Sequence, residues 1–239
     1  MVLPVSGAEP LNVAVASNFA DSARRIAEKF TAVSKIEVQL SGGSSGKLYA
    51  QIENGAPFDV FLSADDRPRL LEEKGLAMAG TRFTYAIGRL ALWSADATLQ
   101  GQDCKQVLMD GRFRHIAIAS PKTAPYGAAA VSVLESLGLP PAKLGDRLVT
   151  GENIAQTLQF VASGSAQLGF VAQSQLRGPN IGRGSCRWDV PAALHAPIEQ
   201  QAVLLARGAK HPAARDFLRH LRSEAIRAQI RLDGYDLNP

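Results

Sequence analysis

Short apolar segments alternate with stretches of helical periodicity along almost the whole chain. The segment LNVAVA (Leu11–Ala16) has the composition of a buried strand, and after it Phe19, Ala23 and Phe30 recur at the spacing of one helix face. The segment RFTYAIGRLALWSA (82–95) alternates in the way that a longer strand does. The same patterns predict further strands at 36–40, 59–64, 115–120, 147–151, 167–172 and 200–206, and helices at 46–55, 67–75, 126–138, 153–164 and 211–230, the last broken near Ser223.

Strands that alternate with helices predict βαβ units, and therefore an α/β fold with mainly parallel sheets flanked by helices. Two such series follow one another, joined by the strand at 82–95 and by the returning strand at 200–206. We therefore expect two lobes with a ligand cleft between them: lobe I from 9–83 plus 204–239, and lobe II from 84–203. The Gly- and Arg-rich segment 177–187 is expected to be a surface loop.

Composition and charge narrow the class of protein only slightly. The 239 residues are 46% hydrophobic and 20% charged, which suits a globular protein with a sizeable core. The net charge of +4 comes from scattered Lys and Arg residues, and no basic run suggests a nucleic acid partner. No apolar segment approaches the roughly 20 residues that span a bilayer.

The N-terminus and the two cysteines bear on the cellular compartment. Ser6-Gly7-Ala8 follows a short apolar fragment and resembles the cleavage site of a truncated secretory signal, although a plain disordered N-terminus would read the same way. Cys104 and Cys186 are too far apart in sequence for a metal or redox motif. They are either a disulfide pair of an oxidising compartment or two free thiols.

Small polar residues precede four of the predicted helices, each directly after a strand. These turns are Ser17-Asn18, Ser41–Gly46, Ala124–Gly127 and Asn153-Ile154. Open α/β sheets bind ligands beyond the carboxyl ends of their strands. A helix N-terminus offers unpaired N–H groups and a partial positive charge, so four converging ends would bind an anion without any cation in contact. A single such turn is an ordinary cap; the coincidence of four favours binding.

The second turn also matches two catalytic motifs. Gly42, Ser44 and Gly46 fit the G-x-S-x-G of a serine hydrolase, in which Ser44 would be the nucleophile. His195 is the one histidine in a predicted loop, but no oxyanion loop of the HGGG type precedes the turn. Gly46-Lys47 resembles the end of a P-loop, but the glycine and hydroxyl spacings fail, so Lys47 is expected to face solvent. The hydrolase stays the alternative from another class.

Four segments carry a resemblance to a known family: ASNFADSARRIAEKF, SGGSSGKLYAQIENGAPFDVFLSAD, PYGAAAVSVLESLGL and SGSAQLGFV. From about Leu11 to Tyr235 the chain resembles the periplasmic molybdate-binding proteins of molybdate ABC transporters, which are type II periplasmic binding proteins. The resemblance implies a two-lobed periplasmic-binding-protein fold and capture of molybdate or tungstate without catalysis or a cofactor. It also implies delivery to the membrane permease of an ABC importer, a monomeric state and a periplasmic location.

The ligand contacts of that family can be carried over by position. They fall on Ser17 and Asn18, on Ser45, and on the backbone amides of Tyr126 and Ile154. All would contact the oxygens of the oxyanion, so no residue would be a direct metal ligand. Some members add a tyrosine whose position here is Ala172, and Asn18 is expected to supply the replacement donor.

The chemistry of these residues suggests which anion they select. Serine hydroxyls, an asparagine amide and backbone N–H groups can all donate hydrogen bonds, which suits a dianion that carries no proton. Phosphate keeps a proton near neutral pH and would require an acceptor; the nearest carboxylate to the turns is Glu152. Sulfate, another proton-free dianion, is the competing ligand, and cavity size would have to exclude it.

Overall fold

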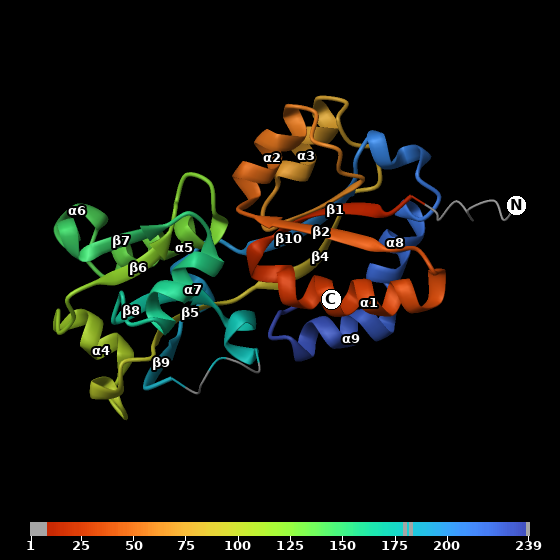
Figure 1. The fold of residues 1–239 in the computed structure, drawn as a ribbon. Helices are drawn as coiled ribbons and strands as arrows, with labels where there is room; N and C mark the ends of the chain where they lie inside the picture. Colours follow the sequence, from red (N-terminus) through yellow and green to blue (C-terminus); the bar gives the residue numbers. More distant parts are fainter. Residues whose placement is uncertain (1–8, 179–180, 182–183, 238–239) are drawn as a thin grey trace, which may run out of the picture.

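The chain folds into two lobes that lie side by side (Figure 1). The structure, a computed structural model, describes residues 9–178, 181 and 184–237. The expected cleavage site at Ser6–Ala8 lies outside these residues. Among the described residues no helix is both long and apolar enough to cross a membrane.

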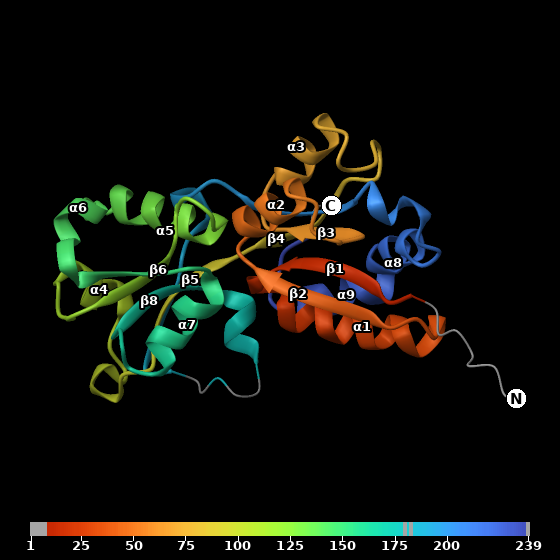
Figure 2. The ribbon, with the colours of Figure 1, turned by 45° about the horizontal axis from the view of Figure 1, so that its top comes forward.

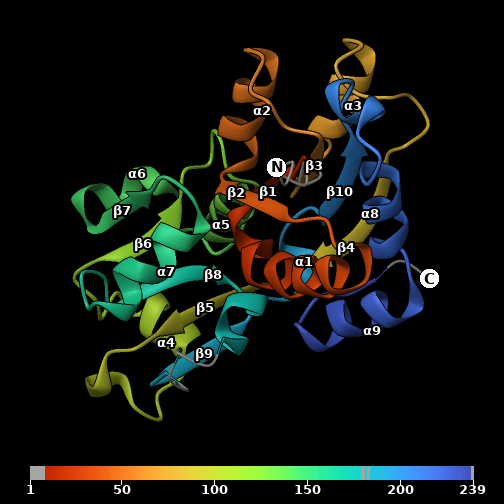
Figure 3. The same ribbon diagram turned by 45° about the vertical axis from the view of Figure 1, so that its right-hand side comes forward.

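Lobe I is a five-stranded sheet with helices on both faces. Its strand order is β2-β1-β3-β10-β4, comprising β1 (Leu11–Ala16), β2 (Val38–Gly43), β3 (Val60–Ser63), β4 (Phe83–Gly88) and β10 (Ile198–Leu204). On one face lie α1 (Ala20–Ser34), α8 (Ala214–Leu221) and α9 (Glu224–Leu232) (Figure 3). These helices cover side chains such as Val13 and Val15. On the other face α2 (Ser45–Glu53) and α3 (Arg67–Glu73) cover Ala14 and Phe61. Alternate residues of β1 therefore enter two separate cores.

Lobe II repeats this plan with a second five-stranded sheet. Its order is β7-β6-β8-β5-β9, comprising β5 (Leu90–Ser94), β6 (Ile116–Ala119), β7 (Leu148–Gly151), β8 (Leu168–Ala172) and β9 (Cys186–Asp189). The helices α4 (Cys104–Met109) and α5 (Pro125–Ser136) pack on one face, and α7 (Ile154–Ala162) on the other (Figure 2). The short α6 (Pro141–Leu144) follows α5.

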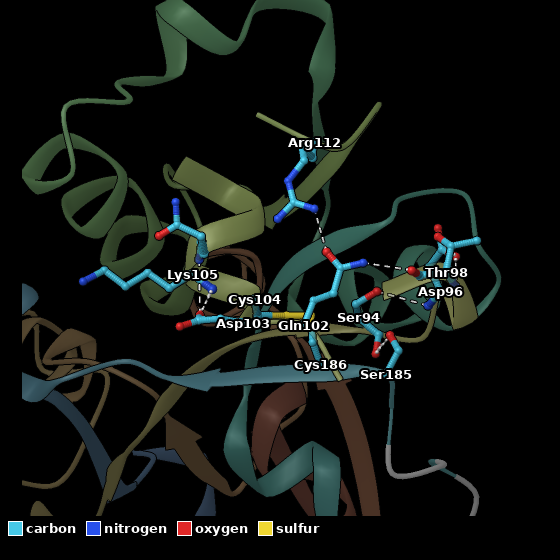
Figure 4. Close-up of a disulfide and its surroundings, with 11 residues drawn as sticks. Ser94, Asp96, Thr98, Gln102, Asp103, Cys104, Lys105, Arg112, Ser185 and Cys186 are labelled. Atoms are coloured by element: carbon cyan, nitrogen blue, oxygen red, sulfur yellow. Dashed lines mark hydrogen bonds between the residues drawn. A yellow bond between two sulfur atoms is a disulfide. The ribbon is translucent and has the colours of Figure 1, made fainter. Parts of the chain in front are cut away.

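A disulfide between Cys104 and Cys186 joins α4 to the edge strand β9 (Figure 4). Neither α4 nor β9 was expected from the sequence, and β9 corrects the expectation of a surface loop through Arg187. Cys104 is fully buried and Cys186 nearly so. The two cysteines left open by the sequence are therefore paired within the core of lobe II.

The sheets are mainly parallel, as expected, with one antiparallel strand in each. Four of the five strands run in one direction: β2, β1, β3 and β4 in the first sheet, and β7, β6, β8 and β9 in the second. The strands that connect the lobes run against their neighbours: β10 is antiparallel to β3 and β4, and β5 is antiparallel to β8 and β9. The hydrophobic pattern of a strand indicates which residues are buried, but it does not indicate in which direction the strand runs relative to its neighbours.

The chain crosses between the lobes at different residues from those expected, if each strand is assigned to the lobe whose sheet it joins. The predicted strand at 82–95 divides at Arg89 into β4, which pairs in the first sheet, and β5, which pairs in the second. The returning strand β10 pairs only in the first sheet, over its whole length from Ile198. By this criterion the chain leaves lobe I at Arg89 and returns before Ile198, rather than at the 83/84 and 203/204 boundaries.

Candidate ligand-binding site

The register of the parallel strands places the predicted turns in two pairs. In lobe I the last residue of β1, Ala16, lies beside Gly43 of β2, so Ser17 and Ser44 follow from neighbouring strand ends. In lobe II the last residue of β6, Ala119, lies beside Gly151 of β7. The turn that leads to Tyr126 and the turn that leads to Ile154 therefore start from one sheet edge.

Contacts between the lobes bring these two pairs together. The N–H of Gly46 donates a hydrogen bond of 2.9 Å to the carbonyl of Thr123. The ammonium of Lys47 lies 2.8 Å from the carboxylate of Glu152. Ser17 lines an interlobe cavity of about 600 Å³ together with residues of α7 and of the 3₁₀ helix Gln173–Arg177. All four turns therefore meet where the lobes touch.

Ser45 is held at the start of α2 by a hydrogen bond to its hydroxyl oxygen. It opens α2 and its side chain is buried. Its hydroxyl oxygen accepts a hydrogen bond of 3.0 Å from the N–H of Ala64, at the end of β3. That bond uses an oxygen lone pair and leaves the hydroxyl proton to donate to a ligand.

The first amide of α7 is left without a partner by its own cap. The side chain of Asn153 accepts from the N–H groups of Ala155 and Gln156, the second and third helical residues. Because these bonds bypass Ile154, its N–H has no acceptor within the helix. The side chain of Gln175 donates to the carbonyl of Ile154 at 3.1 Å. Gln175, which the sequence reading missed, therefore fixes the peptide that follows this amide.

Gln175 also bonds to Ala172, the residue at the position where some members of the family have a tyrosine. Its side-chain oxygen accepts a hydrogen bond of 3.0 Å from the N–H of Ala172, which is fully buried at the end of β8. Gln175 itself is buried. A carboxamide thus joins the ends of β8 and α7, and Ala172 contributes no polar side chain.

Tyr126 can offer its backbone amide, because α5 begins with Pro125, which has no N–H, and Tyr126 is the second residue of the helix. Gly127 allows the helix end to approach β6, since a Cβ there would lie 2.2 Å from the carbonyl oxygen of Ala119. The Tyr126 side chain is buried, and burial raises the pKa of its phenol well above the usual value. The phenol is therefore neutral at physiological pH.

Asn18 is close to the cleft, but its side chain is engaged elsewhere. Its amide nitrogen donates to Gln200 at 2.8 Å and to the hydroxyl of Tyr235 at 3.1 Å. An amide nitrogen has two hydrogens, so these bonds use both. The expected role of Asn18 as the replacement side-chain donor does not agree with this geometry.

Ser44 is the second serine of the turn, and the sequence reading gave it only the hydrolase role. It is the N-cap residue of α2, but its side chain makes no capping bond. Its hydroxyl is buried and has no hydrogen-bonding partner among the described residues. A nucleophilic serine needs a base within hydrogen-bonding reach. His195, the candidate base, bonds instead to the neighbouring carbonyl of Ala196.

Two charged residues beside the candidate ligand turns pair with each other across the lobes. Glu152 forms an ion pair with Lys47, and both side chains are about half exposed. Lys47 therefore contacts solvent, as expected, but also bridges the lobes. Among the described residues no group of three or more His, Cys, Asp or Glu side chains could hold a metal ion.

Comparisons with known proteins match this arrangement over nearly the full chain. Residues 11–236 match the family model described as "Bacterial extracellular solute-binding protein". The molybdate-binding protein ModA of Azotobacter vinelandii is 47% identical over 96% of this chain and 91% of its own. The protein of the same name from Rhodobacter capsulatus is 44% identical over 98% of this chain and 91% of its own.

A solved structure agrees with these sequence matches. The periplasmic molybdate-binding protein of Azotobacter vinelandii superposes with a TM-score of 0.90 at 40% identity, covering 96% of this chain and all of that one. The fold and the sequence therefore lead to the same relatives. The chain belongs to the family of bacterial extracellular solute-binding proteins, together with the molybdate-binding proteins of these two bacteria.

Proposed function

We propose that this chain captures molybdate between its lobes as a dehydrated dianion and delivers it to the permease of an ABC importer. The observation that carries the proposal is the meeting of four helix or 3₁₀-helix beginnings from both lobes around neutral donors. The two relatives named for molybdate, 47% and 44% identical over nearly the whole chain, support the choice of ligand. The proposed ligands are Ser17, Ser45 and the amides of Tyr126 and Ile154.

The donor set explains the preference for a proton-free anion. Donors alone satisfy molybdate, tungstate or sulfate, whereas the remaining proton of phosphate needs an acceptor. Glu152, the carboxylate two residues before Ile154, is paired with Lys47 and is not proposed as that acceptor. Tungstate is nearly the same size as molybdate and should bind comparably, while the smaller sulfate would lose contacts to donors fixed at their spacing.

Closure of the lobes belongs to the mechanism. Fixed dipoles interact weakly with an anion in water and more strongly in a cleft from which water is excluded. The Gly46–Thr123 hydrogen bond and the Lys47–Glu152 ion pair both join the lobes. They describe a closed form, reached by a hinge motion at the two crossing segments. The closed pair of lobes would be the surface that the permease binds.

The setting we propose is the periplasm, with the chain acting as a monomer and without a nucleic acid partner. The family is described as one of extracellular proteins, and the Cys104–Cys186 disulfide is compatible with an oxidising compartment.

Calorimetry and thermal unfolding with sodium molybdate, tungstate, sulfate and phosphate test the proposal. A ligand that binds only the native state stabilises it in proportion to the logarithm of its concentration over Kd. We expect molybdate and tungstate to raise Tm strongly and phosphate to have no effect. If sulfate stabilised the protein more than molybdate, the ligand assignment would be wrong.

A labelling experiment separates binding from hydrolysis. A fluorophosphonate probe reacts with an activated serine, so a serine hydrolase using Ser44 would be labelled. We expect no labelling, because the hydroxyl of Ser44 lacks a neighbouring base. Labelling that Ser44→Ala abolished would favour the enzyme.

A further inference from the structure

Asn18 lies at the centre of a buried hydrogen-bond network at the junction of the lobes. Its side-chain nitrogen donates to the oxygen of Gln200, on the crossing strand β10, and to the hydroxyl of Tyr235, near the C-terminus. All three residues are buried, with exposed fractions of 5% for Asn18, 0% for Gln200 and 3% for Tyr235. Polar groups that are buried to this degree need partners, so the network fixes its members relative to one another.

The backbone of Asn18 is held by the same neighbours. Its carbonyl accepts a hydrogen bond of 2.8 Å from the hydroxyl of Tyr235 and one of 3.3 Å from the hydroxyl of Ser174. Ser174 belongs to lobe II, in the 3₁₀ helix Gln173–Arg177. The backbone of Asn18 is thus tied to Tyr235 near the C-terminus and to the opposite lobe, while its side chain is tied to β10.

Aromatic packing adds to the hydrogen bonds. Phe19, the residue after Asn18, is fully buried, and its ring centroid lies 5.4 Å from that of Tyr235 and 4.7 Å from that of Tyr85. Burial raises the pKa of the Tyr235 phenol well above its usual value, so it remains a donor. The turn from Ser17 to Phe19 is therefore fixed immediately beside the proposed ligand Ser17.

We propose that Asn18, Gln200 and Tyr235 are positioning residues. They hold the Ser17 turn in its anion-binding geometry and connect it to β10, the strand with which the chain returns to lobe I. This inference rests on the proposed molybdate function. Asn18 acts through the network rather than through its own contact with the anion. Tyr235, far from Ser17 in sequence, then controls affinity through the shape of the turn.

Tyr235→Phe is the sharpest single test, because it removes one oxygen and keeps the ring that packs on Phe19. We expect its Kd for sodium molybdate, measured by calorimetry where both proteins are fully folded, to rise by about three- to tenfold, as for loss of a buried hydrogen bond. The control is Tyr49→Phe, which also removes one phenolic hydroxyl, but one that bonds at 3.0 Å to the carboxylate of Glu53 on the exposed side of α2. That variant should bind within about twofold of the wild type, even if it unfolds at lower temperature.

A double-mutant cycle separates positioning from direct contact. If the side chain of Asn18 acts through Tyr235, then Tyr235→Phe should weaken binding less in an Asn18→Ala background than in the wild type, because only the bond to the backbone carbonyl of residue 18 is then left to lose. Losses that multiply would mean that the two side chains act independently of each other, and would overturn the inference. A Tyr235→Phe variant with wild-type affinity would overturn it as well. Failure of the wild type to bind molybdate would instead refute the proposed function.

A second cycle is available if Asn18→Ala does not fold. Tyr235 and Ser174 donate to the same carbonyl of Asn18, so either single variant leaves that oxygen with one donor. Tyr235→Phe with Ser174→Ala would leave it with neither, and its combined loss of molybdate affinity should exceed the product of the single losses. A combined loss equal to or smaller than the product would contradict the network.

Discussion

Lys47 and Glu152 form an ion pair across the two lobes, with the ammonium nitrogen 2.8 Å from a carboxylate oxygen. Lys47 follows Ser45 by two residues and Glu152 precedes Ile154 by two, so the pair lies directly beside two proposed ligand donors. The side chains are 51% and 50% exposed, so solvent weakens their attraction. The pair is positioned to slow the opening of the closed lobes rather than to bind the anion.

Glu152→Ala should therefore speed the release of molybdate. An exposed ion pair contributes about 0.2–1 kcal/mol, so we expect the dissociation rate to rise by up to about fivefold. Release of radiolabelled molybdate into an excess of unlabelled molybdate measures this rate. If Glu152 acted only by repelling the anion, its removal would slow release instead. Asp189→Ala, which breaks the Arg187–Asp189 pair within lobe II, is the matched control.

Gly46 should be replaceable without loss of folding but not without loss of binding. A Cβ at this position would lie 3.0 Å from Cα of Thr123 in the other lobe. We expect Gly46→Ala to weaken molybdate binding by about tenfold or more, because it holds the lobes apart and stretches a donor contact. The free energy of unfolding without ligand should stay the same or rise by up to about 1 kcal/mol, since alanine favours the helix.

Calorimetry and urea unfolding of the Gly46 variant measure these two quantities. Gly42→Ala is the control, because a Cβ there would meet nothing within 4 Å. A Gly46→Ala protein that bound as tightly as the wild type would show that the lobes do not close as described.

Ser45→Ala should remove a hydrogen bond to a charged ligand. Such bonds contribute roughly 1.5–3 kcal/mol, so the Kd for molybdate should rise by about tenfold or more. Calorimetry measures the change, with heats of unfolding to confirm that the loss of the Ala64 contact leaves the fold intact. An unchanged Kd would exclude Ser45 as a ligand.

In the alkaline range, stability should decline because of the buried tyrosines. Burial raises the pKa of Tyr85, Tyr126 and Tyr235 in the folded state. Because the folded-state pKa lies above the unfolded value of about 10, the contribution is fully present below pH 10 and is lost as the pH rises beyond it. Urea unfolding at several pH values should show this decline, whereas molybdate affinity should be constant from about pH 7 to 9. A decline beginning near neutrality would contradict this assignment.

The disulfide should stabilise lobe II without affecting the cleft. Cys104 and Cys186 are 82 residues apart, and closing a loop of that length contributes about 4 kcal/mol in the chain-entropy model. We expect the double variant Cys104→Ala, Cys186→Ala to lose stability in urea while keeping its Kd for molybdate within about twofold. The bond joins α4 to the edge strand β9, away from the four turns.

Much of the fold could be predicted because its strands are short, apolar and bounded by turns. Leu11–Ala16 is the strand that the pattern predicted, and the break between α8 and α9 falls at Ser223. The short helix α4 and the strand β9 were missed, because each is too short to show a period. The antiparallel direction of β5 and β10 was also not predicted, because the pattern of buried residues is the same in a parallel and an antiparallel strand.

The four turns of the candidate site could be predicted because they depend on local chemistry, whereas contacts between residues far apart in the sequence could not. All four turns could be recognised from the small polar residues that precede their helices. The engagement of Asn18 could not be read from the sequence, because its partners Gln200 and Tyr235 are 182 and 217 positions away. The same holds for Gln175, whose bond to Ile154 spans 21 positions, and for the Lys47–Glu152 pair.

An anomalous-diffraction map from crystals grown with sodium molybdate tests the central claim most directly. We expect one molybdenum peak between the lobes, with its oxygens about 3 Å from the hydroxyls of Ser17 and Ser45 and the amide nitrogens of Tyr126 and Ile154. No carboxylate should contact it. A cleft without a peak, or molybdenum held only by surface lysines and arginines, would contradict the account.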